Sequence, residues 1–370
     1  MNVELIDREE ALGAVAEPWR RLASERGNAF VTPEWYLAAL NTLHRGSRPA
    51  VAVVRDGGEV RGLLPLVGEP SGRGQRGARF PGVRYGDIYH PVAAPGDDET
   101  IAVEAAPALA AHLGARCHLD LGRVDADATW WKALARAWPS TMATVSRPEE
   151  ALPYVELDGS TWDEYLAGRS RGLRNQIGRK MRGLRKSHDV RMRRSEATED
   201  VLADFWTMFR LHDARWRGRD TASSVVDAAA RDFHLKFVLD AHRRGWLRLF
   251  LLEVDAVAVA GWYGWRVGDR FSYYQAGFDP SWSRHSVGFL LLAETVREAF
   301  AEGAAEYDLL LGDEAFKARF ATGKRLGRSV LLAPRVSAPR LTATARAWIA
   351  RARGRGVDRG AETPSSSRAR

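Results

Sequence analysis

Three side chains in the second half of the sequence are candidates for acid–base chemistry. Asp308 lies in the apolar run 307–311, where a carboxylate needs a partner or has a raised pKa. Glu314 follows that run, and Tyr274 lies in an aromatic run upstream of it. A reaction that moves protons needs a base and an acid close to the reacting atoms. We predict that Asp308 or Glu314 is the base and that Tyr274 is the acid.

Each of these residues also fits a structural role. Backbone N–H groups or an arginine would satisfy Asp308, and Glu314 would pair with Lys317 along a helix. Tyr273 and Tyr274 are neighbours on the predicted strand, and neighbouring side chains point to opposite faces. Only one of the two tyrosines can therefore face a site, and both suit an aromatic core.

A second group of residues predicts an anion-binding site at the start of a helix. The first N–H groups of a helix have no partner and, together with the helix dipole, attract phosphate. Ser286 suits the N-cap, Gly288 leaves room for a ligand, and Arg284 adds a cation. A plain capped helix start explains the same residues equally well. The predicted site comprises Arg284, His285, Ser286, Val287 and Gly288, and His285 is a further base candidate.

Hydrophobic periodicity predicts the elements that hold these residues. In a helix expected at 286–302, five apolar side chains share one face: Phe289, Leu292, Ala293, Val296 and Phe300. Strands that alternate with helices indicate an α/β sheet, whose ligands bind at the carboxyl ends of its strands. The other expected elements are strands at 270–277, 307–311 and 329–332 and a helix at 313–321.

One order of elements occurs twice along the chain. Hairpins expected at 51–67 and 247–265 each follow a helical segment and each contain a short turn. We therefore predict two related α/β units, 1–155 and 156–334, followed by a basic and largely disordered tail, 335–370. A chain of 370 residues is long enough for two domains.

Composition and the N-terminal residues bear on the cellular compartment of the protein. Cys117 is the single cysteine, so no disulfide forms within the chain. No run reaches the ~18 apolar residues that a membrane helix needs. The N-terminal residues include early acids and lack an apolar leader stretch. These features favour a cytoplasmic protein without stable membrane insertion.

Two basic segments account for the net charge of +8. Residues 169–194 hold eleven Lys and Arg with one acidic residue, and residues 335–370 hold nine Arg with two acidic residues. The first segment carries an apolar helical stripe, so its other faces are cationic. Such a helix is either solvated or contacts an anion such as RNA, an anionic acceptor or the phosphates of a cofactor. The stripe consists of Leu173, Ile177, Met181 and Leu184.

Several motifs in both halves of the sequence carry one resemblance. They are Tyr273-Tyr274, Gly277-Phe278-Asp279-Pro280, Trp282, Ser286, Gly288, Tyr307-Asp308, Gly312, Glu314 and Lys317-Ala318-Arg319-Phe320, with residues 28–35 and 64–66 in the first half. The set resembles the cellulose-biosynthesis-protein (CelD)-like branch of the GNAT acetyltransferase superfamily. That branch is itself similar to the Fem-type peptidyltransferases, which carry two GNAT-like units.

The resemblance implies two tandem GNAT-like units, each with a mixed central β-sheet flanked by helices. It implies an acyltransferase that takes an acetyl or other acyl group from acyl-CoA, with acetyl-CoA as the usual co-substrate, bound at residues 284–288. The acceptor would be an amine or hydroxyl of a small molecule or a cell-envelope component. Fem-type relatives act on aminoacyl-tRNA, so an aminoacyl-tRNA-dependent transferase with tRNA as a partner is the alternative. A non-catalytic binding protein on the same scaffold is a third possibility.

Other motifs lack the context that they need. Residues 72–77 spell G-x-G-x-x-G, but no helix opens after them, so we expect a mobile loop and no dinucleotide site. The sequence contains no P-loop, no G-x-S-x-G and no H-x-x-x-H or C-x-x-C spacing. We therefore expect no metal site.

Overall fold

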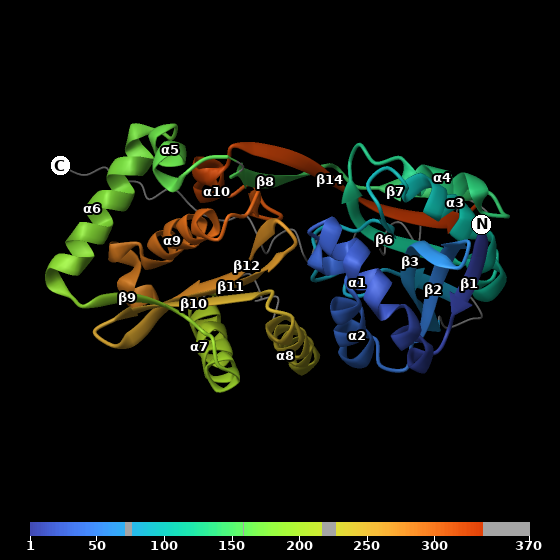
Figure 1. The fold of residues 1–370 in the computed structure, drawn as a ribbon, viewed down its shortest axis with the longest axis horizontal. Helices are drawn as coiled ribbons and strands as arrows, with labels where there is room; N and C mark the ends of the chain where they lie inside the picture. The colour runs from blue at the N-terminus through green and yellow to red at the C-terminus, as the bar shows by residue number, and fades with distance from the viewer. Residues whose placement is uncertain (71–75, 158, 217–226, 336–370) are drawn as a thin grey trace.

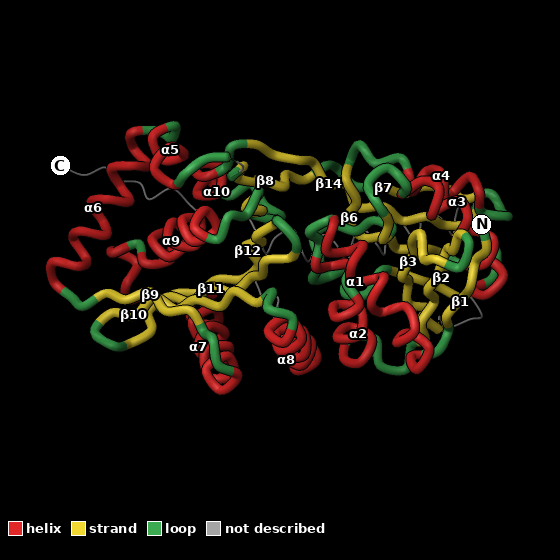
Figure 2. Tube along the Cα trace, in the orientation of Figure 1, coloured by secondary structure: helices red, strands yellow, loops and turns green. Residues whose placement is uncertain are grey.

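A single continuous sheet organises the molecule. The computed structural model describes residues 1–70, 76–157, 159–216 and 227–335. Within them, fourteen strands pair in the order β1-β2-β3-β4-β6-β14-β8-β13-β12-β11-β10-β9, with β5 beside β3 and β7 beside β14. The sheet runs along the length of the molecule (Figure 1), and helices lie on both sides of it (Figure 2). The α/β fold class predicted from the sequence is confirmed.

The first half of the chain, blue to green in Figure 1, forms one end of the sheet. Thr32 caps α2, because its hydroxyl accepts the N–H of Trp35 while Pro33 occupies the first turn. The elements are β1 (Asn2–Ile6), η1 (Glu9–Val15), α1 (Ala16–Glu25), η2 (Ala29–Val31), α2 (Pro33–Thr42), β2 (Arg48–Asp56), β3 (Glu59–Pro70), β4 (Arg76–Arg79), β5 (Val92–Ala93), α3 (Asp98–Leu113), β6 (His118–Asp125), α4 (Trp130–Ala137), β7 (Met142–Ser146) and β8 (Glu150–Glu156), where η marks a 3-10 helix.

The second half forms the other end of the sheet. Helices α7 and α8 lie on one side of β10, β11 and β12, and α9 lies on the opposite side (Figure 1). The elements are α5 (Trp162–Ala167), α6 (Arg171–Ser187), β9 (Val190–Arg194), α7 (Thr198–Trp216), α8 (Ala228–Arg243), β10 (Leu247–Val254), β11 (Val257–Val267), β12 (Arg270–Phe278), η3 (Pro280–His285), α9 (Val287–Ala301), β13 (Glu306–Asp308), α10 (Ala315–Phe320) and β14 (Gly323–Pro334).

Side-chain alternation along β10 divides its residues between two cores. Leu249 and Leu251 join a large core that extends over the first half and includes residues of α7 and α8. Phe250 and Leu252 join a second core under α6 and α9. The apolar stripe predicted in the basic segment is buried in this second core, so α6 is an amphipathic helix whose cationic faces point elsewhere.

The two halves exchange their last strands. β8, which ends the first half, pairs with β13 of the second half. β14, which ends the second half, pairs with β8 over its first residues and then with β6 and β7 of the first half. The boundary at 155/156 stays a prediction, but each half of the sheet includes a strand from the other half of the sequence.

The structure corrects one local prediction, and two others fall almost wholly outside the described residues. The strand predicted at 307–311 ends at Asp308, because Leu310 has a φ of 55° and donates its N–H to the Asp308 carboxylate. Asp308 is thus the last residue of β13, and the hydrogen bond that its carboxylate accepts from Leu310 closes a tight turn after the strand. The predicted loop at 72–77 lies outside the described residues except for its last two residues, and the predicted tail lies outside them except for Arg335.

Candidate active site

β12 and β13 diverge in the second half of the sheet. They pair in parallel from Arg270 to Ser272 with Glu306 to Asp308. Beyond that point β12 pairs with β11 up to Phe278, whereas the chain after β13 follows β8 through the N–H of Leu309. The edge of β12 that faces β13 therefore loses its strand partner, and its backbone N–H groups become available to polarise a carbonyl.

A β-bulge lies where β12 leaves β13. Gly264 on β11 is opposite Tyr273, and Tyr263 is opposite Gln275, so Tyr274 is the extra residue on β12. A bulge changes the direction of the side chains around it. Gly264 is required here, because a Cβ at this position would lie 1.9 Å from the carbonyl oxygen of Ser272.

The two tyrosines at the bulge face opposite cores, as predicted. Tyr273 packs on the α9 side, near Trp262 and Phe316. Tyr274 packs on the other side, and its hydroxyl donates to the carbonyl oxygen of Tyr85 at 3.1 Å. Burial raises the pKa of both phenols. Each phenol is therefore protonated at neutral pH and able to donate a proton.

Asp308 lies at the vertex where the strands diverge. Its side chain is 7% exposed, and its Oδ1 accepts the N–H of Leu310 at 2.8 Å. Burial raises the pKa of this carboxyl to about 6. Alternation from Tyr307, which belongs to the α9-side core, puts Asp308 on the face shared by Ser272 and Tyr274. A carboxyl group with a pKa near 6 is suited to accept a proton near neutral pH.

Glu314 lies on the other side of the sheet from Tyr274. Its Oε2 is 3.1 Å from Nζ of Lys317, which is buried and donates to the carbonyl oxygen of Leu311 at 2.5 Å. The charge of Glu314 contributes to the raised pKa of Tyr273 after the larger effect of burial. The pairing of Glu314 with Lys317 corresponds to the structural role considered from the sequence. Asp308 and Tyr274 thus share one face of the sheet, and Glu314 and Tyr273 lie on the other face.

Helix α9 follows β12 after the short 3-10 helix η3. Asp279 opens η3 by accepting the N–H of Ser281 at 2.9 Å, and η3 leads into α9 at Val287. Ser286 occupies the N-cap position with a φ of 58°, but its side chain makes no capping hydrogen bond, which corrects the prediction that it caps the helix. The first N–H groups of α9 have no partner within the helix. A Cβ at Gly288 would lie 3.1 Å from the ring of Phe278.

Cationic side chains gather beside this helix start. Lys180 of α6 donates to the carbonyl oxygen of Arg284 at 2.6 Å. The Arg284 side chain is exposed, and its Nε donates to Nε2 of His285 at 3.0 Å. Burial and then the charges of Arg284, His188 and Lys180 lower the pKa of His285. The basic helix therefore lies against the predicted anion-binding loop, a proximity that spacing alone did not predict.

Asp87 of the first half also reaches this part of the sheet, and no sequence pattern predicted it. This residue is buried, and its Oδ2 accepts the N–H of Leu311 at 3.2 Å, just beyond β13. Its Oδ1 is 3.7 Å from Nη1 of Arg123. Asp87 and Tyr85 bring the first half to the same face of the sheet as Asp308 and Tyr274. The only signal in the sequence is the polar cluster at 85–90, which follows no recognised motif.

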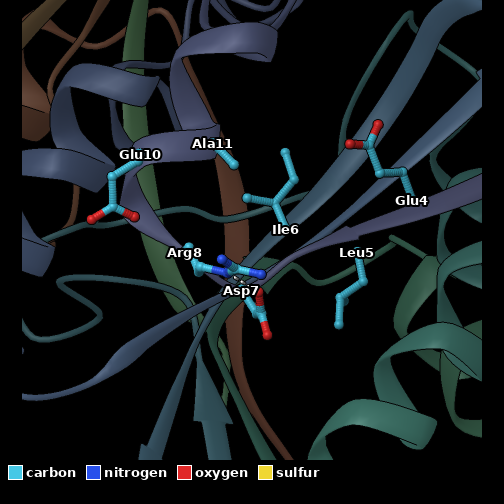
Figure 3. Close-up of a pocket in the computed structure, with 7 residues that line it drawn as sticks. All are labelled: Glu4, Leu5, Ile6, Asp7, Arg8, Glu10 and Ala11. Atoms are coloured by element: carbon cyan, nitrogen blue, oxygen red, sulfur yellow. Dashed lines mark ion pairs between the residues drawn. The ribbon is translucent and has the colours of Figure 1, made fainter.

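A surface hollow occurs at the far end of the sheet, on β1 and η1 (Figure 3). It is lined by Glu4, Leu5, Ile6, Asp7, Arg8, Glu10 and Ala11, all from one short stretch of chain. Among the described residues no three His, Cys, Asp or Glu side chains form a group that could hold a metal ion. No helix in the described part of the chain is long and apolar enough to cross a membrane.

The family comparison identifies the class of the second half. Residues 171–318 match the family model described as Acetyltransferase (GNAT) domain. This segment includes β12, η3, α9 and β13, which form the site described above. The second half of the chain therefore contains a GNAT acetyltransferase domain, and the GNAT resemblance in the sequence is confirmed. No curated protein matches the chain.

Solved structures extend the likeness of fold to both halves. FemX superposes with a TM-score of 0.66 at 12% identity, over 93% of this chain and 100% of FemX. L-PGS from Bacillus licheniformis gives a TM-score of 0.54 at 13% identity, over 96% of this chain and 99% of L-PGS. The C-terminal domain of a putative lysylphosphatidylglycerol synthetase from Agrobacterium fabrum gives a TM-score of 0.53 at 14% identity, over 85% of this chain and 96% of that domain. The likeness to FemX agrees with the Fem-type resemblance in the sequence.

Proposed function

We propose that the protein is a GNAT-type N-acyltransferase that takes an acyl group, usually acetyl, from acyl-CoA. The observation that carries this proposal is the separation of β12 from β13 beside the N-terminus of α9, within the GNAT segment. The helix start offers N–H groups to a pyrophosphate, and Arg284 and Lys180 add positive charge there. The free edge of β12 offers N–H groups to a thioester carbonyl.

The catalytic roles follow from which side chains share a face. An acceptor amine reaches Asp308 and Tyr274 from the side of the first half, near Asp87 and Tyr85. Asp308 takes the ammonium proton, the amine nitrogen bonds to the carbonyl carbon, and the C–S bond breaks. Tyr274 then protonates the thiolate, because burial keeps its phenol protonated. The first half thus shapes the acceptor site, for a small molecule or a cell-envelope component.

Aminoacyl-tRNA is the alternative donor, and one observation favours it. Helix α6 is cationic and contacts the loop before α9 through Lys180 and Arg284. An RNA backbone would be held there by phosphate contacts that weaken steeply with salt. The fold shared with FemX and with L-PGS adds support, because the sequence resembles Fem-type enzymes.

Calorimetric titration with acetyl-CoA tests the proposal, with bulk tRNA as the parallel ligand. Acetyl-CoA is expected to bind the wild-type protein with a Kd in the micromolar range. In Gly288→Trp the indole fills the space before α9, and binding is expected to fall at least about tenfold. Gly172→Trp, at an exposed position near the start of α6, is the control and retains binding.

Three results would decide between the candidate functions. Acetyl-CoA binding that is unchanged in Gly288→Trp would contradict the assigned site. Salt-dependent binding of tRNA without acetyl-CoA binding would favour the aminoacyl-tRNA alternative. The absence of binding to both ligands would favour a non-catalytic role on the GNAT scaffold.

A further inference from the structure

A cluster of ring side chains lies beside the loop that precedes α9. His188 follows α6, and its ring lies 5.1 Å from the indole of Trp282 in η3. The ring of His285 lies 5.3 Å from the same indole and 6.0 Å from His188, at 90° to it. Two imidazoles thus lie around one partly exposed indole, on two segments of chain that the fold brings together, η3 and the end of α6.

Asp255 fixes the orientation of His188. Nδ1 of His188 donates to Oδ2 of Asp255 at 2.7 Å, and the N–H of Asp189 donates to Oδ1 at 2.9 Å. The hydrogen bond from His188, and then that from Asp189, lowers the pKa of Asp255, so this carboxylate is ionised near neutral pH. The proton of neutral His188 is therefore on Nδ1, and Nε2 on the other side of the ring is left for another partner.

Cationic side chains border the indole, together with the carboxylates of Asp255 and of Asp279, which caps η3. Lys180 from α6 and Arg284 from η3 border the cluster, and their charges act on His285. Among the described residues, no carboxylate lies within ion-pair distance of Lys180, Arg284 or His285. Cationic side chains beside a partly exposed indole suit a ligand that carries both a phosphate and a flat aromatic ring. A nucleotide has this combination.

We propose that His188, Trp282 and His285 bind the adenosine 3′-phosphate end of the acyl-CoA donor. The inference rests on the proposed function, because the cluster directly adjoins residues 284–288, where the pyrophosphate would bind. The adenine stacks on Trp282, and the imidazoles with Lys180 and Arg284 hold the phosphate monoester. An aminoacylated tRNA has no phosphate monoester on its terminal adenosine, so this subsite selects CoA over tRNA.

The test compares CoA with dephospho-CoA, which differs only by lacking the 3′-phosphate. Calorimetry on the full chain at pH 6 is expected to show that the wild-type protein binds CoA about tenfold more tightly than dephospho-CoA. A factor of about ten corresponds to one charge-assisted hydrogen bond to the 3′-phosphate. In His188→Gln/His285→Gln the ratio of the two affinities is expected to fall to about one to two. His242→Gln, on α8 at the opposite face of the sheet, is the matched control and keeps the ratio.

Each outcome bears on a different claim. Equal binding of CoA and dephospho-CoA by the wild-type protein overturns the subsite and leaves the acyl-CoA proposal standing. A tenfold ratio that survives in the double variant also overturns the subsite. Failure of both ligands to bind overturns the proposed function, and the subsite with it. Thermal unfolding of each variant verifies that the fold is intact.

Discussion

Asp308 is expected to lower the stability of the folded protein at neutral pH. Its side chain is 7% exposed, and it accepts one backbone hydrogen bond, from Leu310. Burial raises its pKa from the ordinary 3.8 to about 6. The charged form is therefore disfavoured in the folded state, and Asp308→Asn, which keeps the shape and removes the ionisation, is the perturbation that reveals the effect.

The magnitude follows from the pKa change. A rise from 3.8 to about 6, at about 1.4 kcal/mol per pH unit, amounts to about 3 kcal/mol. Between these two values the folded state binds more protons than the unfolded state. The free energy of unfolding therefore falls as pH rises through this window, and it stays lower above pH 6 by about 3 kcal/mol.

Urea unfolding of wild type and Asp308→Asn at pH 4, 5, 6, 7 and 8 measures this contribution. The difference in free energy of unfolding, variant minus wild type, is expected to increase by about 2.4 kcal/mol from pH 4 to pH 7, because the unfolded carboxyl is already more than half ionised at pH 4. A pH-independent cost of the new amide group cancels in this comparison. Asp313→Asn, an exposed acid nearby, is the control. A flat difference across the pH range would refute the reasoning, and so would a decrease.

Two further predictions concern the space around two glycines and an ion pair between Arg248 and Glu302. Gly277→Ala is expected to cost at least about 3 kcal/mol in urea unfolding, because the new Cβ would lie 2.1 Å from the backbone nitrogen of His212. Gly183→Ala, in open space on α6, should instead raise stability by about 0.5–1 kcal/mol, and equal effects at the two glycines would count against this account. Arg248→Met is expected to cost about 2 kcal/mol in urea unfolding, since Glu302 loses the Arg248 Nε at 2.7 Å but keeps Arg194 at 3.2 Å. A stability equal to that of the wild type would disprove it.

Local elements were predictable because their signals are local. The apolar spacing from Phe289 to Phe300 predicted α9 to within one residue at each end. The turn at 254–256 predicted the hairpin of β10 and β11, where Asp255 and Ala256 have φ values of 51° and 64°. The opposite faces of Tyr273 and Tyr274 followed from strand alternation alone.

The site could not be assembled from local signals. The bulge at Tyr274 is defined by which residues of β11 it opposes, and spacing along one strand does not contain that information. Asp87 contacts Leu311 across 224 positions of sequence. The pairing of His188 with Asp255 likewise depends on β9 and β10 lying side by side. The candidate residues were therefore predicted singly, while their grouping depends on the tertiary structure.

The exchange of β8 and β14 affects the order in which a growing chain can fold. Ribosomal synthesis delivers the first half before residues 323–334 exist. Until then β6 and β7 have no strand between them, and their edges are open to pairing with other chains. The first half can close its sheet only when the last described strand has left the ribosome. We expect the two halves to mature together as one cooperative unit, and a chain cut at 155/156 to yield fragments that need each other to fold.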